Sequence, residues 1–327
     1  MTLAAPSELA PGHAACALDA PVLCRLDELG VIAARGEDAA KFLQGQLTND
    51  VLSLGEGLQL NGYCTAKGRL IATFRQWRDA DAICLQLPRD ILAPVLKRLS
   101  MFVLRAKARL SDDSAAWTAY GLVGPRAETS LSQAGLPVPA NAWHAAVAAN
   151  GVRVARLPDA AITGSRFMIL VPAGATLPGL SVGMAPAEVW WWSEVESAVP
   201  TVWAATQEKF VPQMINLEVL GGVNFRKGCY PGQEVVARSQ YLGKLRRRMA
   251  LARLDAPPPT AGSDVWVEGE SEPAGTVVMA AARPAGGTAL LFEAPVDRLE
   301  RDLHEGSPDG PRLAIQPLPY AIFDPTA

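Results

Sequence analysis

The amino-acid sequence predicts a mixed α+β protein with an all-β C-terminal part. Between about residues 22 and 197, short strand-like segments alternate with amphipathic helical segments in two successive rounds, which is typical of split βαβ units. From about residue 245 the helical periodicity stops, and prolines and glycines separate short apolar runs, as in a small barrel-like domain. Neither G-x-G-x-x-G nor G-x-x-x-x-G-K-[ST] occurs, which disfavours a doubly wound nucleotide-binding fold.

The first round begins with an apolar strand within residues 22–36. The segment EDAAKFLQGQLTNDV (37–51) places apolar side chains at helical spacing behind an aspartate in a first-turn position, so it predicts a helix. RLIATFRQWR (69–78) and DAICLQL (81–87) predict paired strands. RDILAPVLKRLSMFV (89–103) predicts a helix with a proline near its first turn, where proline is tolerated.

A basic strand is predicted to close this round. In LRAKARL (104–110) apolar residues alternate with Arg105, Lys107 and Arg109, which predicts a half-buried strand with a positively charged outer face. This face, like the run from Lys244 to Arg248, could attract an acidic ligand or partner. Solvated surfaces explain both features more simply.

The second round repeats the order of strands and helices. AWTAYGLVG (116–124) predicts a strand and RAETSLSQAGL (126–136) a helix, and further strands are expected near VRVARL (152–157) and FMILVPA (167–173). A second helix is predicted over about residues 186–197.

This last helix carries three consecutive tryptophans. Successive helical residues are rotated by about 100°, so the three indoles cannot share one face. The apolar stripe predicts Trp191 as the core member, flanked by Trp190 and Trp192. Two interpretations stay open: all three indoles pack in the core, or one flanking indole lines a cavity and stacks on a flat heterocycle.

Length and composition limit the classes of function. The chain has 327 residues with a formal net charge of -3, so no global field attracts nucleic acid or an anionic membrane. No stretch reaches the roughly 18 to 20 apolar residues of a membrane span. We expect a flexible leader over residues 1–20, a main domain over 21–244 and a β domain over 245–327.

The five cysteines show no C-x-x-C spacing, and the three histidines are scattered. A disulfide framework is therefore not expected, and the pattern favours a reducing cytoplasm. A zinc site built by the protein alone is not expected either, because no histidine lies within helical reach of a cysteine. A metal held by Cys229 would need ligands from elsewhere.

The segment around Cys229 differs from the rest of the chain. Arg226 and Lys227 precede the thiol, and two such cations would favour the thiolate and lower its pKa if the segment is exposed. Gly228 and Gly232 permit unusual backbone conformations, so the thiol is expected in a shaped turn. The alternative is a small buried cysteine in a tight turn.

A helix is predicted to follow directly, from Gln233 with Glu234 in its favourable first turn. Its free N–H groups would further stabilise a nearby thiolate. A Cys-His hydrolase is disfavoured, since no histidine lies near Cys229 in the sequence.

Several segments together resemble one known family. They are FLQGQLTNDV (42–51), CTAKGRL (64–70), VESAVPTVW (195–203), the long run from 210 to 238 that contains KGCYPGQE, and LPY (318–320). The chain resembles the YgfZ family of folate-binding proteins. The resemblance implies the glycine-cleavage T-protein fold: two ferredoxin-like units plus a small C-terminal β-barrel around a central folate-binding cavity.

The resemblance also implies a function and a set of site residues. It implies a tetrahydrofolate-binding accessory protein for assembly or repair of iron-sulfur clusters in target enzymes, including tRNA-modifying ones. The implied catalytic residues are Cys229, as a reactive thiol, and Lys227; the implied cofactor-binding residues are Trp190, Tyr230, Gln233 and Glu234; Gly228, Gly232 and Arg238 complete the motif. At Leu29 the chain departs from family members that have a second aromatic residue for folate.

The expected ligand is tetrahydrofolate or a one-carbon derivative, without a permanently bound metal. A single thiolate cannot hold a cluster that ordinarily takes four protein ligands, so Cys229 would be a transient ligand beside a carrier or client protein. The alternative is a folate-dependent aminomethyltransferase or one-carbon transferase. Asp90 is its only candidate general acid or base, and a helix-capping role suits Asp90 better. Direct binding of nucleic acid is not expected, because no basic-aromatic stripe occurs.

Overall fold

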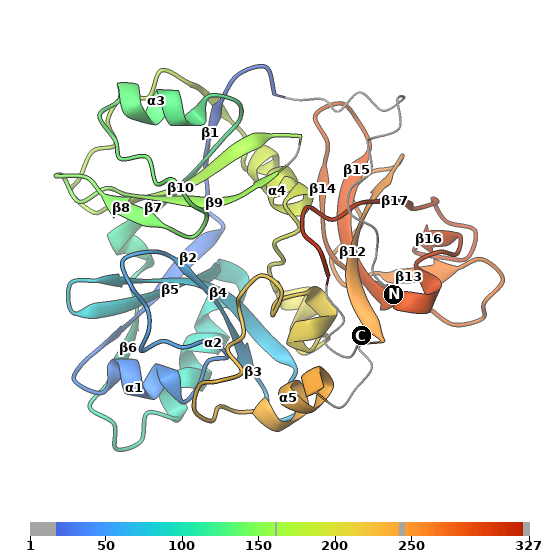
Figure 1. Cartoon of the computed structure of the whole chain (residues 1–327), viewed down its shortest axis with the longest axis horizontal. Helices are drawn as coiled ribbons and strands as arrows, with labels where there is room; N and C mark the ends of the chain where they lie inside the picture. Colours follow the sequence, from blue (N-terminus) through green and yellow to red (C-terminus); the bar gives the residue numbers. More distant parts are fainter. Residues whose placement is uncertain (1–17, 161, 242–245, 323–327) are drawn as a thin grey trace.

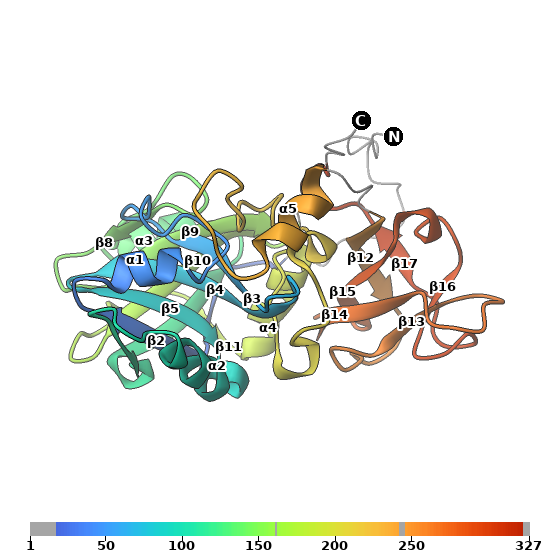
Figure 2. The same ribbon diagram turned by 90° about the horizontal axis from the view of Figure 1, so that it is seen from below.

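The computed structural model describes residues 18–160, 162–241 and 246–322. Most of the expected leader, Lys244 of the basic run and the expected boundary at 244/245 lie outside the described residues. The described part of the chain contains three β-sheets together with several helices. Figures 1 and 2 show two of them stacked, with the third beside them.

The first sheet and its helices form a ferredoxin-like unit. Its elements are β2 (Leu29–Arg35), α1 (Ala39–Gln44), β3 (Gln59–Cys64), β4 (Leu70–Asp79), β5 (Ala82–Pro88), α2 (Arg89–Met101) and β6 (Arg109–Asp112). The strand order is β3-β4-β5-β2-β6. Without the added edge strand β3, this is the order of a βαββαβ unit, with the first and third strands in the centre. Both helices bury apolar side chains such as Phe42 and Ile91 on one face of the sheet.

The second sheet has the same ferredoxin-like strand order, except that one of its strands comes from a different part of the sequence. Its elements are β1 (Val22–Arg25), β7 (Trp117–Val123), α3 (Ala127–Gln133), β8 (Ala145–Val147), β9 (Arg153–Ala160), β10 (Gly164–Pro172), β11 (Gly183–Ala185) and α4 (Ala187–Glu196). The order is β11-β1-β7-β10-β9-β8, so β1 from the start of the chain takes the place beside β7 that a fourth strand would occupy. The chain therefore passes from the second sheet (β1) to the first sheet (β2) and connects the two units at its first two strands.

The third sheet is the predicted all-β part. Its strands are β12 (Arg247–Leu254), β13 (Asp264–Val267), β14 (Gly275–Ala282), β15 (Thr288–Pro295), β16 (Leu303–Glu305) and β17 (Ala314–Gln316). They form one curled half-barrel in the order β16-β13-β14-β15-β12-β17. The remaining helices are α5 (Gln233–Tyr241) and the 3-10 turns η1 (Ser114–Ala116), η2 (Ala204–Thr206), η3 (Pro212–Ile215) and η4 (Val296–Arg298).

The first and second sheets pack face to face. Apolar side chains from both sheets meet between them, among them Val31 and Cys84 from the first sheet and Met168 and Leu170 from the second. The helices α1, α2 and α3 cover the outer faces, whereas α4 lies between the second and third sheets, as Figure 1 shows. Because α4 is covered on two sides, two of its three tryptophans are buried.

The expectation of Trp191 as the core member was wrong. Trp190 and Trp192 are both wholly buried, and Trp191 is partly exposed. Trp190 packs in the core shared by the first two sheets, and Trp192 packs in the core that reaches the third sheet. A single apolar stripe identifies the buried face only when a helix is covered from one side.

The predicted basic strand over 104–110 was also wrong for most of its length. Pairing with β2 begins at Arg109, and a turn at Val103–Ala106 precedes it. Leu104 is 86% exposed and has a φ of +46°, in the left-handed region. The alternating pattern lacks a neighbouring strand here, because the chain must reverse after α2 before it reaches the edge of β2.

A buried ion array joins α4 to both stacked sheets. The Glu194 carboxylate accepts a hydrogen bond from Arg75 on β4 and forms an ion pair with Arg166 on β10, with 2.6 Å between the nitrogen and oxygen atoms. Arg166 also donates to Ser193 Oγ at 3.0 Å and Ser197 Oγ at 2.6 Å. Both Arg166 and Glu194 are completely buried, so the array fixes α4 against the sheets from inside the core.

Candidate functional site

The loop that carries Cys229, residues 221–232, is called the thiol loop. It is held by the FLQGQLTNDV segment. Thr48 Oγ1 donates to the Gly222 carbonyl at 2.7 Å, and Asn49 Nδ2 donates to the Gly221 carbonyl at 2.6 Å. The Asn224 N–H in turn donates to the Thr48 carbonyl at 3.0 Å. Two segments far apart in the sequence are thereby joined through buried polar side chains.

Lys227 is the internal anchor of the thiol loop. Its side chain is buried, and Nζ donates to the carbonyls of Gln44 and Leu47, the second at 2.6 Å. Nζ also lies 5.1 Å from the centre of the Tyr230 ring, in a cation–π contact. Burial lowers the pKa of Lys227 to about 8, and the charges of Asp50 and Cys229 act in the opposite direction.

The second anchor is a close backbone contact at Gly232. This residue has a φ of +81°, and a Cβ there would lie 2.4 Å from the Thr65 carbonyl oxygen and 2.7 Å from Gly68 Cα. The CTAKGRL turn therefore packs directly on the end of the thiol loop. Helix α5 starts at the next residue, Gln233, as predicted, and Figures 1 and 2 show it beside the β3–β4 end of the first sheet.

Cys229 itself is exposed. The other described cysteines, Cys24, Cys64 and Cys84, are buried, and burial raises their thiol pKa values to about 11, 12 and 12. The interpretation of Cys229 as a small buried residue is thus excluded. Among residues 18–160, 162–241 and 246–322, no three His, Cys, Asp or Glu side chains gather as metal ligands would.

The lowered pKa of Lys227 predicts a specific pH dependence. Between pH 8 and 10.5 the native protein releases the Lys227 proton while the unfolded chain keeps it, so the free energy of unfolding should rise with pH in that window. Relative to Lys227→Met, we expect the wild type to gain about 2 kcal/mol between pH 7 and pH 10. Urea unfolding of both proteins at several pH values measures this. A wild-type-to-variant difference that stays constant with pH would contradict it.

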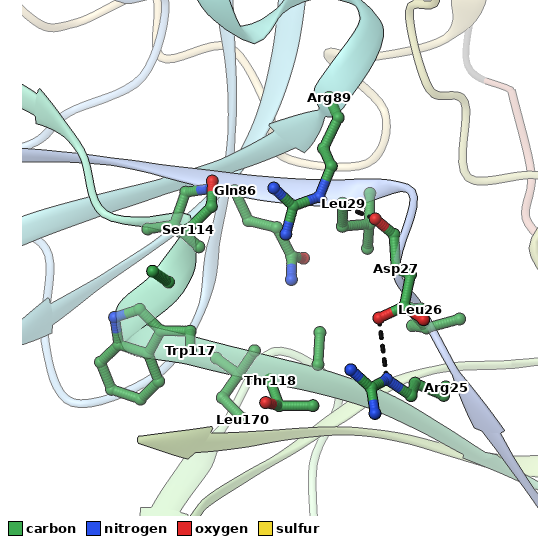
Figure 3. Close-up of a pocket in the computed structure, with 13 residues that line it drawn as sticks. Arg25, Leu26, Asp27, Leu29, Gln86, Arg89, Ser114, Trp117, Thr118 and Leu170 are labelled. Carbon is green, nitrogen blue, oxygen red and sulfur yellow. Dashed lines mark hydrogen bonds and ion pairs between the residues drawn. The ribbon is translucent and has the colours of Figure 1, made fainter. Parts of the chain in front are cut away.

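A central pocket of about 250 Å³ lies between the first and second sheets. Two connections that cross from one sheet to the other frame it, namely the turn between β1 and β2 and the η1 turn between β6 and β7. Figure 3 shows its lining, which consists of Arg25, Leu26, Asp27, Leu29, Val31, Gln86, Arg89, Ser114, Ala115, Trp117, Thr118, Ala119 and Leu170. Aliphatic walls, one indole and a few polar groups are the usual lining of a small-molecule site.

The charged groups of the central pocket, Arg25, Asp27 and Arg89, lie on one side of it. Arg25 Nε donates to Asp27 Oδ1 at 2.8 Å, and Arg89 Nε donates to the Asp27 carbonyl at 2.7 Å, so Asp27 orients both guanidinium groups. Trp117 forms the opposite wall and is itself held edge-on against Trp77, with ring centres 5.4 Å apart. In Figure 3 the Gln86 amide points into the space between them.

A second, small pocket of about 10 Å³ lies next to the central pocket. The two share Leu29 and Gln86 in their linings. Arg75 of the buried ion array and the Pro200–Thr201 segment after α4 close its other side. Its volume corresponds to about one water molecule.

The implied folate-binding residues Trp190, Tyr230, Gln233 and Glu234 line neither of the two pockets. Trp190 packs against Gly121, where a Cβ would lie 2.0 Å from the indole, and Arg166 covers its ring at 4.9 Å. Its ring is enclosed by protein, so it presents no face to either pocket. Tyr230 is buried in the thiol loop, while Gln233 and exposed Glu234 begin α5, and none of the three lines a pocket.

Other implied positions fall as follows. Leu29 does line both pockets. The exposed side chain of Asp90 accepts the Ala204 N–H at 3.0 Å, which caps η2 from a neighbouring element. Arg238 is exposed on α5. No residue of the thiol loop lines either of these two pockets, so the thiol and the central pocket are separate features.

Sequence reasoning missed Arg25, Gln86, Arg89 and Trp117. Each lies in a segment whose pattern predicts only a strand or the start of a helix. The four side chains come close together only because the two sheets stack. The one available signal was a polar residue, Gln86, inside the otherwise apolar strand DAICLQL.

Comparison with known proteins gives relatives over most of the chain. A protein of Photorhabdus laumondii is 30% identical over 309 residues, covering 92% of this chain and 92% of its own. An Escherichia coli O127:H6 protein is 28% identical over 92% and 93%, and a Colwellia psychrerythraea protein is 32% identical over 74% and 75%. All three are named tRNA-modifying protein YgfZ. The chain belongs to the YgfZ family. No family model matches it.

The fold of this YgfZ-family chain is that of a glycine-cleavage T protein. The aminomethyltransferase T of the glycine cleavage system from Bartonella henselae superposes with a TM-score of 0.73 at 18% identity, covering 91% of this chain and 86% of that one. The expected T-protein fold is confirmed. In the described part of the chain, no helix is long and apolar enough to cross a membrane.

Proposed function

We propose that the protein is a tetrahydrofolate-binding accessory protein for the assembly or repair of iron-sulfur clusters in target enzymes, including tRNA-modifying ones. The name of its relatives supports the link to tRNA modification, and the aminomethyltransferase fold supports a folate-type ligand. The observation that carries the proposal is one exposed thiol on a loop fixed by buried contacts.

The thiol loop suits brief contact with a cluster as cargo. Lys227 and Gly232 fix the loop on either side of Cys229, so the sulfur is presented without a large loss of loop entropy on binding. One thiolate supplies at most one of the four ligands that a cluster takes. The other ligands come from a carrier or client protein, which makes the partnership transient.

The central pocket suits the heterocycle of a folate. Its volume of about 250 Å³ is slightly below the roughly 300–1,000 Å³ of pockets that enclose a drug-sized ligand, so the tail of the ligand would lie outside. Arg25 and Arg89 at the polar side would meet the carboxylates of that tail, and Trp117 provides a flat wall for the ring. Bound tetrahydrofolate would supply a reduced pterin that can carry one-carbon units.

One-carbon transfer as the main function has less support. Asp90 is exposed and accepts a hydrogen bond from the Ala204 N–H. Asp27 is the only carboxylate in the lining of the central pocket, and it is paired with Arg25. A general acid or base needs a carboxyl free to exchange a proton with the ligand.

Replacement of the thiol tests the proposal. In a strain that lacks the protein, we expect Cys229→Ala and Cys229→Ser each to lose at least tenfold in rescue of an iron-sulfur tRNA-modifying enzyme, because a hydroxyl is a poor ligand for iron. An exposed side chain contributes little to folding, so the unfolding free energy should change by no more than about 0.5 kcal/mol. Full rescue by both variants would remove the thiol from the function.

A further inference from the structure

Gln86 is a buried polar residue at the apolar interface of the two stacked sheets. It lies on β5, paired with Val31 on one side and Arg75 on the other, and is 2% exposed. Its side chain lines both the central and the small pocket. An amide in such a position is retained at a cost in stability unless its donors and acceptor are matched.

Only one end of this amide has a partner among the described residues. Nε2 lies 3.9 Å from Met168 Sδ, a weak contact, and Oε1 has no hydrogen-bond partner. A thioether sulfur can only accept, so the nitrogen belongs on the sulfur side and the carbonyl oxygen is left over. Figure 3 shows the amide directed into the central pocket, where a ligand donor can reach it.

The surrounding groups define the chemistry of the missing partner. Trp117 offers a flat aromatic wall beside the amide, and Leu29 and Leu170 add aliphatic contact. Among the described residues, Arg89 donates a hydrogen bond from Nε to the Asp27 carbonyl, and its terminal nitrogens form no ion pair. The pocket therefore suits a flat heterocycle with a ring or exocyclic N–H, joined to an anionic group.

We propose that Gln86 is the residue that selects the ligand of the central pocket, by accepting an N–H of a flat heterocycle with its free carbonyl oxygen. The inference deepens the folate part of the proposed function and rests on it for the identity of the ligand. A reduced pterin carries such N–H groups.

Titration calorimetry of tetrahydrofolate binding to the wild type, Gln86→Met and Gln76→Met tests this assignment. Methionine keeps the volume and removes the amide, so we expect Gln86→Met to bind at least about tenfold more weakly. Gln76 is the matched control: it is also buried on β4 with an unpartnered Oε1 but lines neither pocket, so Gln76→Met should bind like the wild type.

Thermal melting without ligand separates a binding role from a structural one. Removing a buried, unmatched carbonyl should leave the melting temperature of Gln86→Met equal to or above that of the wild type. A lower melting temperature would mean that the amide is satisfied within the fold, and would overturn the assignment.

Guanosine, a flat N–H heterocycle unrelated to folate, distinguishes the two proposals. If the wild type and Gln86→Met bind tetrahydrofolate equally, the assignment of Gln86 fails and folate binding stands. If only guanosine binds, and Gln86→Met loses it, the assignment stands and the folate proposal fails. If neither compound binds the wild type, both fail.

Discussion

Glu194→Gln is expected to cost about 3–5 kcal/mol of unfolding free energy, because it leaves two guanidinium groups buried with no counter-charge. The wild-type carboxylate is completely enclosed and pairs with both Arg75 and Arg166. The array joins β4, β10 and α4. Its loss should therefore weaken the packing between the two ferredoxin-like units and the packing of α4 against both of them. Urea unfolding followed by tryptophan fluorescence measures the change.

The matched control is a surface pair of the same type. Glu37 pairs with Lys107 at 2.9 Å, but both side chains are more than 70% exposed. Glu37→Gln should therefore change the unfolding free energy by no more than about 0.5 kcal/mol. Equal effects of Glu194→Gln and Glu37→Gln would refute the role assigned to the buried array.

Gly232→Ala is expected to destabilise the protein by about 2–4 kcal/mol. A non-glycine residue in the left-handed region costs about 1–2 kcal/mol, and here the new methyl group would also collide with backbone atoms of Thr65 and Gly68 that cannot rotate away. The thiol loop would have to separate from the CTAKGRL turn. We expect lower stability by urea unfolding together with loss of rescue in the strain that lacks the protein.

Gly228→Ala provides the contrast within the same motif. A Cβ at Gly228 meets no atom within 4 Å, and its φ lies outside the left-handed region. Its unfolding free energy should stay within about 0.5 kcal/mol of the wild type. A larger loss for Gly228→Ala than for Gly232→Ala would show that the contact at Gly232 does not hold the loop.

Local patterns in the sequence were sufficient for much of the fold. Helical spacing located α1, α2, α3 and α4, and the apolar runs located the main strands of all three sheets. The thiol loop was also found from local chemistry, since glycines and charges around one cysteine are uncommon in this chain. These features depend on neighbours within a few residues, and so they can be read from a single sequence.

What failed depended on neighbours from distant parts of the chain. The burial of Trp190 and Trp192 follows from cover on two sides of α4, and the loss of the basic strand over 104–108 follows from the absence of a neighbouring strand. The central pocket is of the same kind, because Gln86, Trp117 and Arg25 become neighbours only when β1 joins the second sheet.

The sequence by itself determined the element order, the all-β C-terminal part and the motif that presents Cys229. Tertiary structure alone decided that Trp190 is enclosed, that the thiol loop is separate from the pocket, and that a buried amide faces the pocket. The physical reason is range: helix and strand periodicity arises from local backbone geometry, whereas a cavity and its polar lining arise where separately folded surfaces meet.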